Sequence, residues 1–413
     1  MEKFRKLGLS QKLIEVLKEL KFEKPSKIQQ EAIPPAIAGN DIIGKSATGS
    51  GKTLAFASPI IENLKPNGTT QALILTPTRE LTEQVANSIK KFSKNKKLKT
   101  LTIYGGVSIG EQIRKIPNTD VIVGTPGRIL DHLERRTLNL NKIKFLVLDE
   151  VDRMFDMGFH RDVEKIIAKC PRERQTMLFS ATISADIDHL AKKHTHNATK
   201  ISVESYIDKS KLKQIYYDVQ NNAKFSLLIH LLNNEKSNLI MVFCNTRRNV
   251  DFVEKNLKKN KIDATAIHGG LTQSRRSKIM DNFQGGGVHV LVCTDVAARG
   301  LDIPGVSHIY NYDLPPTSND YIHRVGRTAR AGKEGIAINL LSNRDYENFD
   351  NIKRDDSLII EPQELPQFEM IYLKPEFDRR RFESRNGING NRRHHNSNQR
   401  SPPRRKNFNR PRR

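Results

Sequence analysis

The sequence predicts an α/β protein with two tandem domains of mostly parallel sheet and a disordered basic C-terminal tail. Three observations support this prediction. The length of 413 residues accommodates two or three hydrophobic cores at about 150 residues per domain. Short apolar runs rich in β-branched residues alternate with helical periods in both halves of the chain, which is typical of parallel α/β sheets. The final segment is strongly basic and almost free of aliphatic residues.

Buried parallel strands are expected where a short apolar run ends abruptly in small, polar or acidic residues. Such runs occupy residues 72–75, 121–123, 145–148 and 177–179 in the first half, and residues 239–243, 290–292 and 336–341 in the second. Between them, apolar side chains are spaced for one buried helical face, as at Leu13, Ile14, Leu17 and Leu20 and at Phe159, Val163, Ile166 and Ile167. Open α/β sheets bind ligands at the carboxyl ends of their strands, where the polar clusters of this chain fall.

The charge distribution sets the expected domain boundaries. We predict a first domain over residues 1–203, a linker over 204–213, a second domain over 214–362 and a disordered tail over 363–413. Residues 376–413 hold 13 Arg and Lys against 3 Asp and Glu, so they carry +10 of the formal charge of +24. Such a segment cannot bury enough apolar surface to offset its ordering entropy. It could tether RNA through counterion release, or it could only aid solubility.

The overall charge indicates a polyanionic partner, either nucleic acid or an anionic membrane surface. No apolar run approaches the roughly 18 residues of a membrane-spanning helix, and the start MEKFRK lacks a signal-peptide core. We therefore expect a cytoplasmic protein with no membrane partner. Cys170, Cys244 and Cys293 are far apart and form no C-x-x-C pair, so disulfides and structural zinc are not expected.

A glycine-rich string, SATGSGKT, covers residues 46–53 between the apolar pair Ile42-Ile43 and a helix-compatible segment. Strand, glycine loop and helix form the context of a phosphate-binding loop. Gly49 and Gly51 allow backbone N–H groups to face a phosphate, Lys52 would reach the β- and γ-phosphates, and Thr53 would hold Mg²⁺. Ser46 replaces the first Gly of the strict pattern, and a chance loop is the alternative.

Two further clusters fit a nucleotide site. The pair Asp149-Glu150 ends an apolar run, where one carboxylate can hold the Mg²⁺ shell and the other can orient the attacking water. Alone, such a pair could also be a solvated turn. The segment HRVGRTAR contains Arg324, Arg327 and Arg330, and one or two of these could stabilise a γ-phosphate held by the other domain. An exposed basic turn is the alternative.

Taken together, these motifs resemble the DEAD-box family of ATP-dependent RNA helicases, within superfamily 2. The resemblance runs from about Phe4 to about Leu341 and consists of many short motifs in the family's order. It implies two RecA-like domains and an RNA-dependent ATPase. The tetrad of residues 149–152 reads DEVD, with Val where the family has Ala, and all three acids remain.

The resemblance implies a role for each matching residue of the ATP site. Phe22 would stack on adenine, supported by Phe4, and Gln29 would hydrogen-bond the base; alone, Gln29 could be a helix-start residue. The implied ATP-binding set is Phe22, Gln29, Thr48, Gly49, Ser50, Gly51, Lys52, Thr53 and Asp302, and Thr53 and Asp149 would hold Mg²⁺. The implied catalytic residues are Lys52, Asp149, Glu150, Arg327 and Arg330, and those coupling hydrolysis to strand separation are Asp152, Ser180, Thr182 and His323.

The same resemblance implies an RNA-binding set. Its members are Pro77, Thr78, Arg79, Gly105, Gly106, Thr125, Gly127 and Arg128 in the first domain and Arg276 and Thr294 in the second. Gly and Pro-Gly turns expose N–H groups, and Thr and Arg add donors for phosphate and 2′-OH groups. This set indicates a reader of the RNA backbone. Taken singly, Gly105-Gly106 and the 125–128 turn could be ordinary tight turns.

The resulting hypothesis is an ATP-dependent RNA helicase. Its domains would close on ATP, Mg²⁺ and single-stranded RNA, separate short duplexes and remodel RNA or RNA–protein complexes, and hydrolysis would release the RNA. We expect a monomer, with protein partners that the sequence does not specify. Three alternatives stay open: an ATP-dependent RNA clamp or scaffold with weak turnover, a duplex-DNA translocase, and RNA annealing by the tail alone.

Overall fold

In the computed structural model, the described residues are 1–46, 49–203, 211–234, 238–298, 303, 305–329 and 334–372. Residues Met1–Ile371 form one compact unit. Most of the predicted tail, from residue 373 onward, lies outside the described residues. Within the described ranges, every helix is too short or too polar to cross a membrane.

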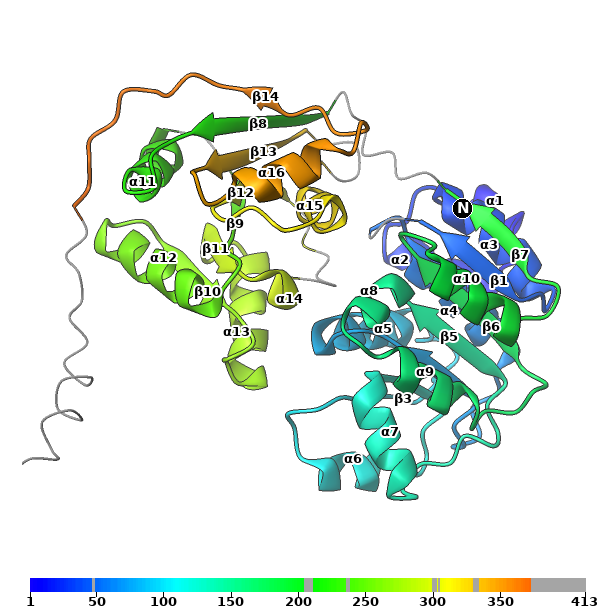
Figure 1. Ribbon diagram of the computed structural model, residues 1–413. Coiled ribbons are helices and arrows are strands. Elements are labelled where there is room, and N and C mark those ends of the chain that lie inside the picture. Colours follow the sequence, from blue (N-terminus) through cyan, green and yellow to red (C-terminus); the bar gives the residue numbers. More distant parts are fainter. Residues whose placement is uncertain are drawn as a thin grey trace, which may run out of the picture. The chain divides into compact units, whose positions relative to one another are not determined.

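The first half of the chain forms a seven-stranded sheet in which all neighbours run parallel (Figure 1). The strand order is β3-β4-β2-β5-β6-β1-β7. The strands are β1 (Ile42–Lys45), β2 (Ala72–Leu75), β3 (Thr100–Ile103), β4 (Val121–Gly124), β5 (Phe145–Asp149), β6 (Gln175–Ser180) and β7 (Thr199–Ser202).

Helices cover both faces of this sheet because successive strand residues alternate between two hydrophobic clusters. In β2, Ala72 and Ile74 belong to one cluster, whereas Leu73 and Leu75 belong to the other. The helices are α1 (Glu2–Arg5), α2 (Gln11–Glu19), α3 (Lys27–Ile37), α4 (Lys52–Asn63), α5 (Arg79–Phe92), α6 (Ile109–Lys115), α7 (Pro126–Glu134), α8 (Val151–Asp156), α9 (His160–Ile167) and α10 (Ala185–His194).

The second half forms another parallel sheet with the order β10-β11-β9-β12-β13-β8-β14. This order is that of the first sheet with every label raised by seven, so the two domains share one topology. Its strands are β8 (Leu212–Asp218), β9 (Leu239–Phe243), β10 (Ala264–Ile267), β11 (Val290–Cys293), β12 (Val306–Asn311), β13 (Gly335–Leu341) and β14 (Glu361–Pro362). Its helices are α11 (Lys224–Asn234), α12 (Arg247–Lys259), α13 (Gln273–Gln284), α14 (Asp295–Ala298), α15 (Ser318–Val325) and α16 (Tyr346–Lys353).

All seven apolar runs predicted as strands are strands, and the two predicted helical faces lie on α2 and α9. Leu20 is the exception, because it follows the last residue of α2 and is 37% exposed. The sequence pattern missed strands whose side chains are partly polar. Strand β3 reads TLTI and lies at an edge of its sheet. Strand β12 is central but contains Ser307 and His308, which share a hydrogen bond of 2.8 Å between Oγ and Nδ1. A pattern based on apolar runs does not detect polar pairs of this kind.

Two boundaries differ by a few residues from the expected ones. Strand β8 begins at Leu212, inside the segment assigned to the linker. At the other end, the N–H of Gln363 donates to the carbonyl of Tyr216 (2.9 Å), and the N–H of Ile371 donates to Oγ of Ser226 (3.0 Å). Residues 363–371, assigned to the tail from composition, therefore belong to the compact unit.

Candidate functional site

The phosphate-loop motif lies between β1 and α4, as predicted. Gly51 is the N-cap of α4 and has φ +95° and ψ 18°, a left-handed conformation that favours glycine. Lys52 begins the helix, and its buried Nζ donates to the carbonyl of Ser46 (3.1 Å). The loop therefore leads directly into a helix N-terminus, which attracts anions. Thr48 lies outside the described residues, while Gly49, Ser50 and Thr53 flank the helix start.

Gln29, expected to read adenine, contacts this loop. Its Nε2 donates to the carbonyl of Gly51 (3.0 Å), and its Oε1 accepts from the N–H of Ser26 (3.0 Å). A Cβ on Gly51 would lie 2.4 Å from Nε2, so the contact requires glycine there. The structure thus brings together the predicted base-reading and phosphate-binding segments.

Phe22 packs in an aromatic cluster. Its ring centroid lies 6.3 Å from that of Phe4 and 5.9 Å from that of Phe92, both edge-on. The position of Phe4 as a supporting aromatic matches the expectation from the resemblance. An edge-to-face cluster fixes the orientation of the Phe22 ring.

Asp149 and Glu150 lie at the carboxyl end of β5 and are 3% exposed each. Oδ1 of Asp149 lies 3.9 Å from Nζ of Lys52 and has no hydrogen-bond partner in the described part of the chain. Glu150 has φ 54° and ψ 54°, an uncommon conformation for a residue with a Cβ, of the kind that clusters at functional sites. The acids therefore lie beside the phosphate loop, as predicted.

The two carboxylates titrate in opposite directions. Burial raises the pKa of Asp149, and the nearby Lys52 only partly opposes this rise. Burial would also raise the pKa of Glu150, but the charges of Arg153, Lys52 and Arg327 outweigh it and lower this pKa. Carboxylates with diverging pKa values typically have different chemical roles. Glu150 is thus held ionised.

Arg153, which the sequence analysis did not single out, connects the two domains. It is 1% exposed, its Nη1 donates to Oε2 of Glu150 (2.8 Å), and its Nη2 lies 3.0 Å from Nδ1 of His323 on α15. Since Arg can only donate, Nδ1 of His323 accepts in this contact. His323, expected as a coupling residue, is therefore connected to Glu150 of the acidic tetrad through Arg153. In the sequence, the only indication of a role for Arg153 is that it directly follows the acidic tetrad.

The three coupling residues of the first domain form one hydrogen-bonded cluster. Oδ2 of Asp152 accepts from the N–H of Thr182 (3.0 Å) and from its Oγ1 (3.3 Å). Oγ of Ser180 accepts from the N–H of Asp152 (3.2 Å), and the carbonyl of Ser180 accepts from the N–H of Ser46 (2.9 Å). This cluster joins the acidic tetrad to the start of the phosphate loop.

The arginines of the 323–330 segment differ in their surroundings. Arg327 is 3% exposed, its Nε donates to the carbonyl of His323 (3.2 Å), and its charge acts on Glu150. Arg324 instead binds groups of its own domain. Arg330 lies outside the described residues, as does Asp302, the expected ribose contact.

The expected RNA residues of the first domain lie at the ends of β2, β3 and β4, three neighbouring strands. Thr78 is the N-cap of α5, and its Oγ1 accepts from the N–H of Leu81 (3.3 Å). Arg79 begins that helix and lies against Gly106, where a Cβ would be 2.2 Å from its Nη1. A Cβ on the preceding Gly105 would lie 3.6 Å from Nη2 of Arg79. Pro77, between strand and helix, is buried.

The 125–128 turn completes this group. Thr125 is the N-cap of α7, and its N–H donates to the carbonyl of Ile103 at the end of β3 (3.0 Å). Nη1 of Arg128 donates to the carbonyl of Val107 (3.2 Å), while Gly127 is exposed. One edge of the sheet thus gathers the RNA set, while β1, β5 and β6 carry the ATP set.

In the second domain, Arg276 has an unexpected partner. Its Nη2 lies 2.9 Å from Oε1 of Glu80, which is next to Arg79 in the first domain, and Gln273 donates to the same carboxylate (3.3 Å). Arg276 and Glu80 are both largely buried, with 9% and 7% of their side chains exposed. Thr294, at the end of β11, is also buried.

The repeated topology reveals residues that the sequence analysis missed. Thr246 caps α12 after β9 as Thr78 caps α5 after β2. Arg247 follows it and lies against the pair Gly269-Gly270, where a Cβ on Gly269 would be 3.1 Å from Nη2. This repeats the packing of Arg79 on Gly105-Gly106. Two sequence similarities could have indicated Arg247: residues 244–248 (CNTRR) resemble residues 76–80 (TPTRE), and residues 268–270 (HGG) resemble residues 104–106 (YGG).

The residues present fit a Mg²⁺ ion bound together with a nucleotide. Among the described residues, the buried Oδ1 of Asp149 accepts no hydrogen bond and has the Lys52 ammonium only at 3.9 Å, so a closer cation or donor would offset its desolvation. The described residues contain no cluster of three or more His, Cys, Asp or Glu that could hold a metal alone. Mg²⁺ typically binds one or two protein groups together with water and phosphate oxygens.

The comparisons with known proteins agree with this arrangement. Residues 26–190 match the family described as DEAD/DEAH box helicase, and residues 223–332 match the helicase conserved C-terminal domain. The DEAD-box ATP-dependent RNA helicase CshA of Bacillus cereus (strain ATCC 10987 / NRS 248) is 42% identical over 369 residues, which cover 89% of this chain and 70% of that protein. The ATP-dependent RNA helicase CshA of Listeria monocytogenes is 41% identical over 90% of this chain and 72% of its own.

Solved structures are similar over a comparable range. The S. cerevisiae Dbp5 bound to RNA and ADP BeF3 has a TM-score of 0.80 at 32% identity, covering 88% of this chain and 96% of that one. A DEAD box protein from the hyperthermophile Methanococcus jannaschii has a TM-score of 0.54 at 40% identity, covering 88% and 99%.

Proposed function

This chain belongs to the DEAD-box family of ATP-dependent RNA helicases, and from that premise we propose that it couples hydrolysis of one bound ATP to local separation of short RNA duplexes. One observation carries the proposal. The ends of a single sheet present the ATP set at β1, β5 and β6 and the RNA set at β2, β3 and β4. Occupation of one set can therefore affect the other through a shared rigid sheet.

The ATP site is proposed to work as follows. Phe22 and Gln29 hold the adenine, and the phosphates lie on the loop N–H groups of residues 48–51 and the N-terminus of α4. Lys52 neutralises the β- and γ-phosphates. Asp302, outside the described residues, holds the ribose.

Glu150 orients the attacking water and accepts its proton, a role that an ionised carboxylate can perform. Thr53 and Asp149 would hold Mg²⁺, which supplies charge neutralisation at the phosphates when bound. This assignment is supported by the buried Oδ1 of Asp149, which accepts no hydrogen bond from the described residues.

The second domain contributes the remaining positive charge. Arg327 and Arg330 stabilise the charge that develops on the γ-phosphate. His323 keeps its segment near the tetrad through Arg153. Because Arg327 comes from the other domain, hydrolysis requires both domains at the nucleotide, which ties turnover to domain closure.

RNA is proposed to bind along both domains by its backbone. Arg79, Arg128 and Arg276 supply charge, and the turns at residues 105–106, 125–127 and 294 supply neutral donors. Arg247, placed like Arg79 by the repeated topology, joins this set. A backbone reader of this kind binds many sequences.

The cluster of Asp152, Ser180 and Thr182 is the proposed coupling element. It joins the acidic tetrad, the phosphate loop and β6 by the hydrogen bonds described above. We assign residues 1–203 to the first domain, residues 204–211 to the linker and residues 212–371 to the second domain, since β8 begins at Leu212 and residues 363–371 belong to the compact unit. The tail is an accessory RNA tether.

We also propose that the protein acts as a cytoplasmic monomer on RNA and RNA–protein complexes. Its three cysteines are buried free thiols, as is usual in a reducing compartment.

The test is steady-state ATPase activity of the full chain with and without single-stranded RNA, together with unwinding of a short RNA duplex. RNA should stimulate hydrolysis, and DNA of the same sequence should not. Equal rates with and without RNA would refute the coupled mechanism. Hydrolysis limited to one burst, with a long-lived RNA complex, would indicate a clamp instead.

A further inference from the structure

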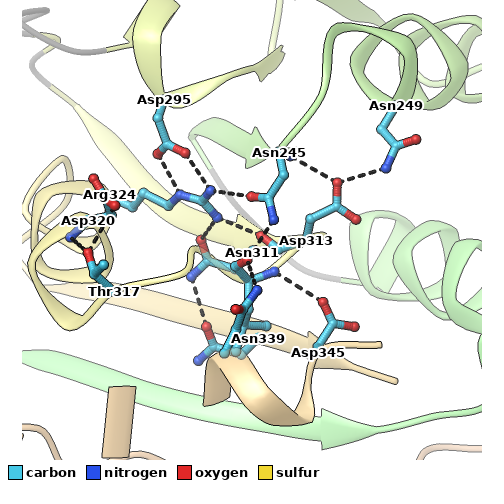
Figure 2. Close-up of polar contacts among 12 residues, drawn as sticks. Asn245, Asn249, Asp295, Asn311, Asp313, Thr317, Asp320, Arg324, Asn339 and Asp345 are labelled. Atoms are coloured by element: carbon cyan, nitrogen blue, oxygen red, sulfur yellow. Dashed lines mark hydrogen bonds and ion pairs between the residues drawn. The ribbon is translucent and has the colours of Figure 1, made fainter. Parts of the chain in front are cut away.

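The Arg324 side chain is saturated by groups of its own domain (Figure 2). Nε and Nη2 donate to Oδ1 and Oδ2 of Asp295, both at 2.6 Å. Nη1 donates to Oδ1 of Asn311 (3.1 Å) and to the carbonyl of Asp313 (2.6 Å), and Nη2 also donates to Oδ1 of Asn245 (2.8 Å). Since a guanidinium has five N–H donors, all of them are used.

The acceptors come from the ends of three adjacent strands. Asp295 follows β11, Asn245 follows β9, and Asn311 ends β12. The guanidinium also lies 5.1 Å from the ring centroid of Phe243 at the end of β9. Arg324 is 1% exposed, and the strand ends that surround it correspond to those of β4, β2 and β5 in the first sheet.

Residues on both sides of this ion pair belong to the proposed sites. Thr294, a proposed RNA contact, directly precedes Asp295, and its carbonyl accepts from the N–H groups of Ala297 (3.0 Å) and Ala298 (2.9 Å). His323 directly precedes Arg324, and Arg327 lies just beyond the end of α15, where its N–H donates to the carbonyl of Arg324 (3.0 Å). The pair therefore joins the RNA-contacting segment of this domain to its ATP-contacting segment.

We propose that the Asp295–Arg324 ion pair is a positioning element that transmits RNA binding at Thr294 to Arg327 at the nucleotide. The inference rests on the proposed function and adds a path for coupling within the second domain. A bidentate guanidinium–carboxylate pair fixes direction as well as distance, so a shift of the Thr294 segment moves α15 with it. Neither residue contacts substrate in this scheme.

The experiment compares variants of the full chain in ATP and RNA binding. The measured quantity is the coupling factor, the ratio of ATP affinity with saturating RNA to ATP affinity without RNA. Asp295→Asn keeps the shape but removes the charge and the double acceptor. Its ATP affinity alone and RNA affinity alone should stay within about twofold of the wild type. The coupling factor should fall about tenfold, so at saturating RNA the KM for ATP should rise and kcat should fall, while the KM without RNA stays unchanged.

Asp345→Asn is the matched control. Asp345 forms another buried ion pair of this domain, with Nζ of Lys224 at 2.7 Å, and it contacts neither Arg324 nor α15 through its side chain. Its loss should lower thermal stability but leave the coupling factor unchanged. An equal loss of coupling in Asp345→Asn would show that general destabilisation is the cause, and would overturn the proposal.

Arg324→Lys keeps the charge and removes the fork, so it should lower coupling as Asp295→Asn does. If either Asp295→Asn or Arg324→Lys does not fold, the coupling factor of the other variant tests the proposal. Retention of the wild-type coupling factor in either folded variant would refute the positioning role. A wild type without any coupling between RNA and ATP would instead refute the proposed function, so the two failures are distinguishable.

Discussion

Replacing Gly51 by Ala tests the contact between the base-reading and phosphate-binding segments. At φ +95°, an Ala costs about 1–2 kcal/mol because its Cβ meets the backbone. That Cβ would also lie 2.4 Å from Nε2 of Gln29, so Gln29 must move. Its two hydrogen bonds, each worth about 1 kcal/mol, would then be lost or lengthened. With both bonds lost, the total is about 3–4 kcal/mol.

Gly39→Ala supplies a matched control. Gly39 has φ +94°, and nothing lies within 4 Å of a Cβ built there. This variant should carry only the backbone cost of about 1–2 kcal/mol. The difference between the two variants therefore isolates the Gln29 contact. In a Gln29→Ala background, Gly51→Ala should cost no more than Gly39→Ala does, since Ser26 Oγ can rotate away.

The assay is urea unfolding of the first domain, identified as the transition that added ATP shifts, together with titration of a fluorescent ATP analogue. Gly51→Ala should lower ATP affinity at least about tenfold, equivalent to 1.4 kcal/mol, whereas Gly39→Ala should leave it unchanged. Equal urea midpoints and equal affinities for the two variants would refute the reasoning.

Four further predictions concern other parts of the chain. In Glu150→Gln the side chain can still accept from Arg153, so its free energy of unfolding in urea should stay within about 1 kcal/mol of the wild type. Its steady-state rate of phosphate release should fall about 10²–10⁴-fold, and an unchanged rate would contradict the role of Glu150. Arg79→Ala should weaken RNA binding for all sequences and lower the slope of log affinity against log salt by about 1, as fluorescence anisotropy at several salt concentrations would show. Deletion of residues 373–413 should weaken RNA binding at low salt but leave the maximal ATPase rate at saturating RNA unchanged. His132 is buried between Gln112 and Thr137, and burial lowers its pKa from 6.5; the unfolded chain therefore binds this proton more readily, so first-domain stability should fall as pH drops below about 6.5, and less so in His132→Asn.

The sequence predicted those parts of the molecule whose structure follows from a local pattern of residues. Apolar runs such as residues 72–75 mark strands because both faces of a parallel sheet are buried. The phosphate loop was predictable because glycines, lysine and the following helix lie within a few residues of each other. The polar strand β12 was not, since its His308 is satisfied by a neighbouring hydroxyl rather than exposed.

Contacts between segments that are far apart in the sequence could not be predicted from individual motifs. Glu80 and Arg276 belong to different domains, and neither residue type indicates its partner. Arg324 was one of three arginines in a short segment, and only the strand ends that surround it distinguish it from Arg327. Arg153 likewise acquires a role only when His323 comes within 3.0 Å.

The shared topology of the two domains has a consequence for stoichiometry. By strand order, the segment of the second domain that corresponds to the phosphate loop is residues 219–223, between β8 and α11, and it reads VQNNA, without a glycine. The lysine that begins α11, Lys224, is buried in an ion pair with Asp345 at 2.7 Å. This segment therefore offers a triphosphate neither a glycine loop nor an unpaired lysine. Calorimetric titration should accordingly give one bound nucleotide per polypeptide, and the second domain takes part in hydrolysis only through the residues that it adds to the site of the first.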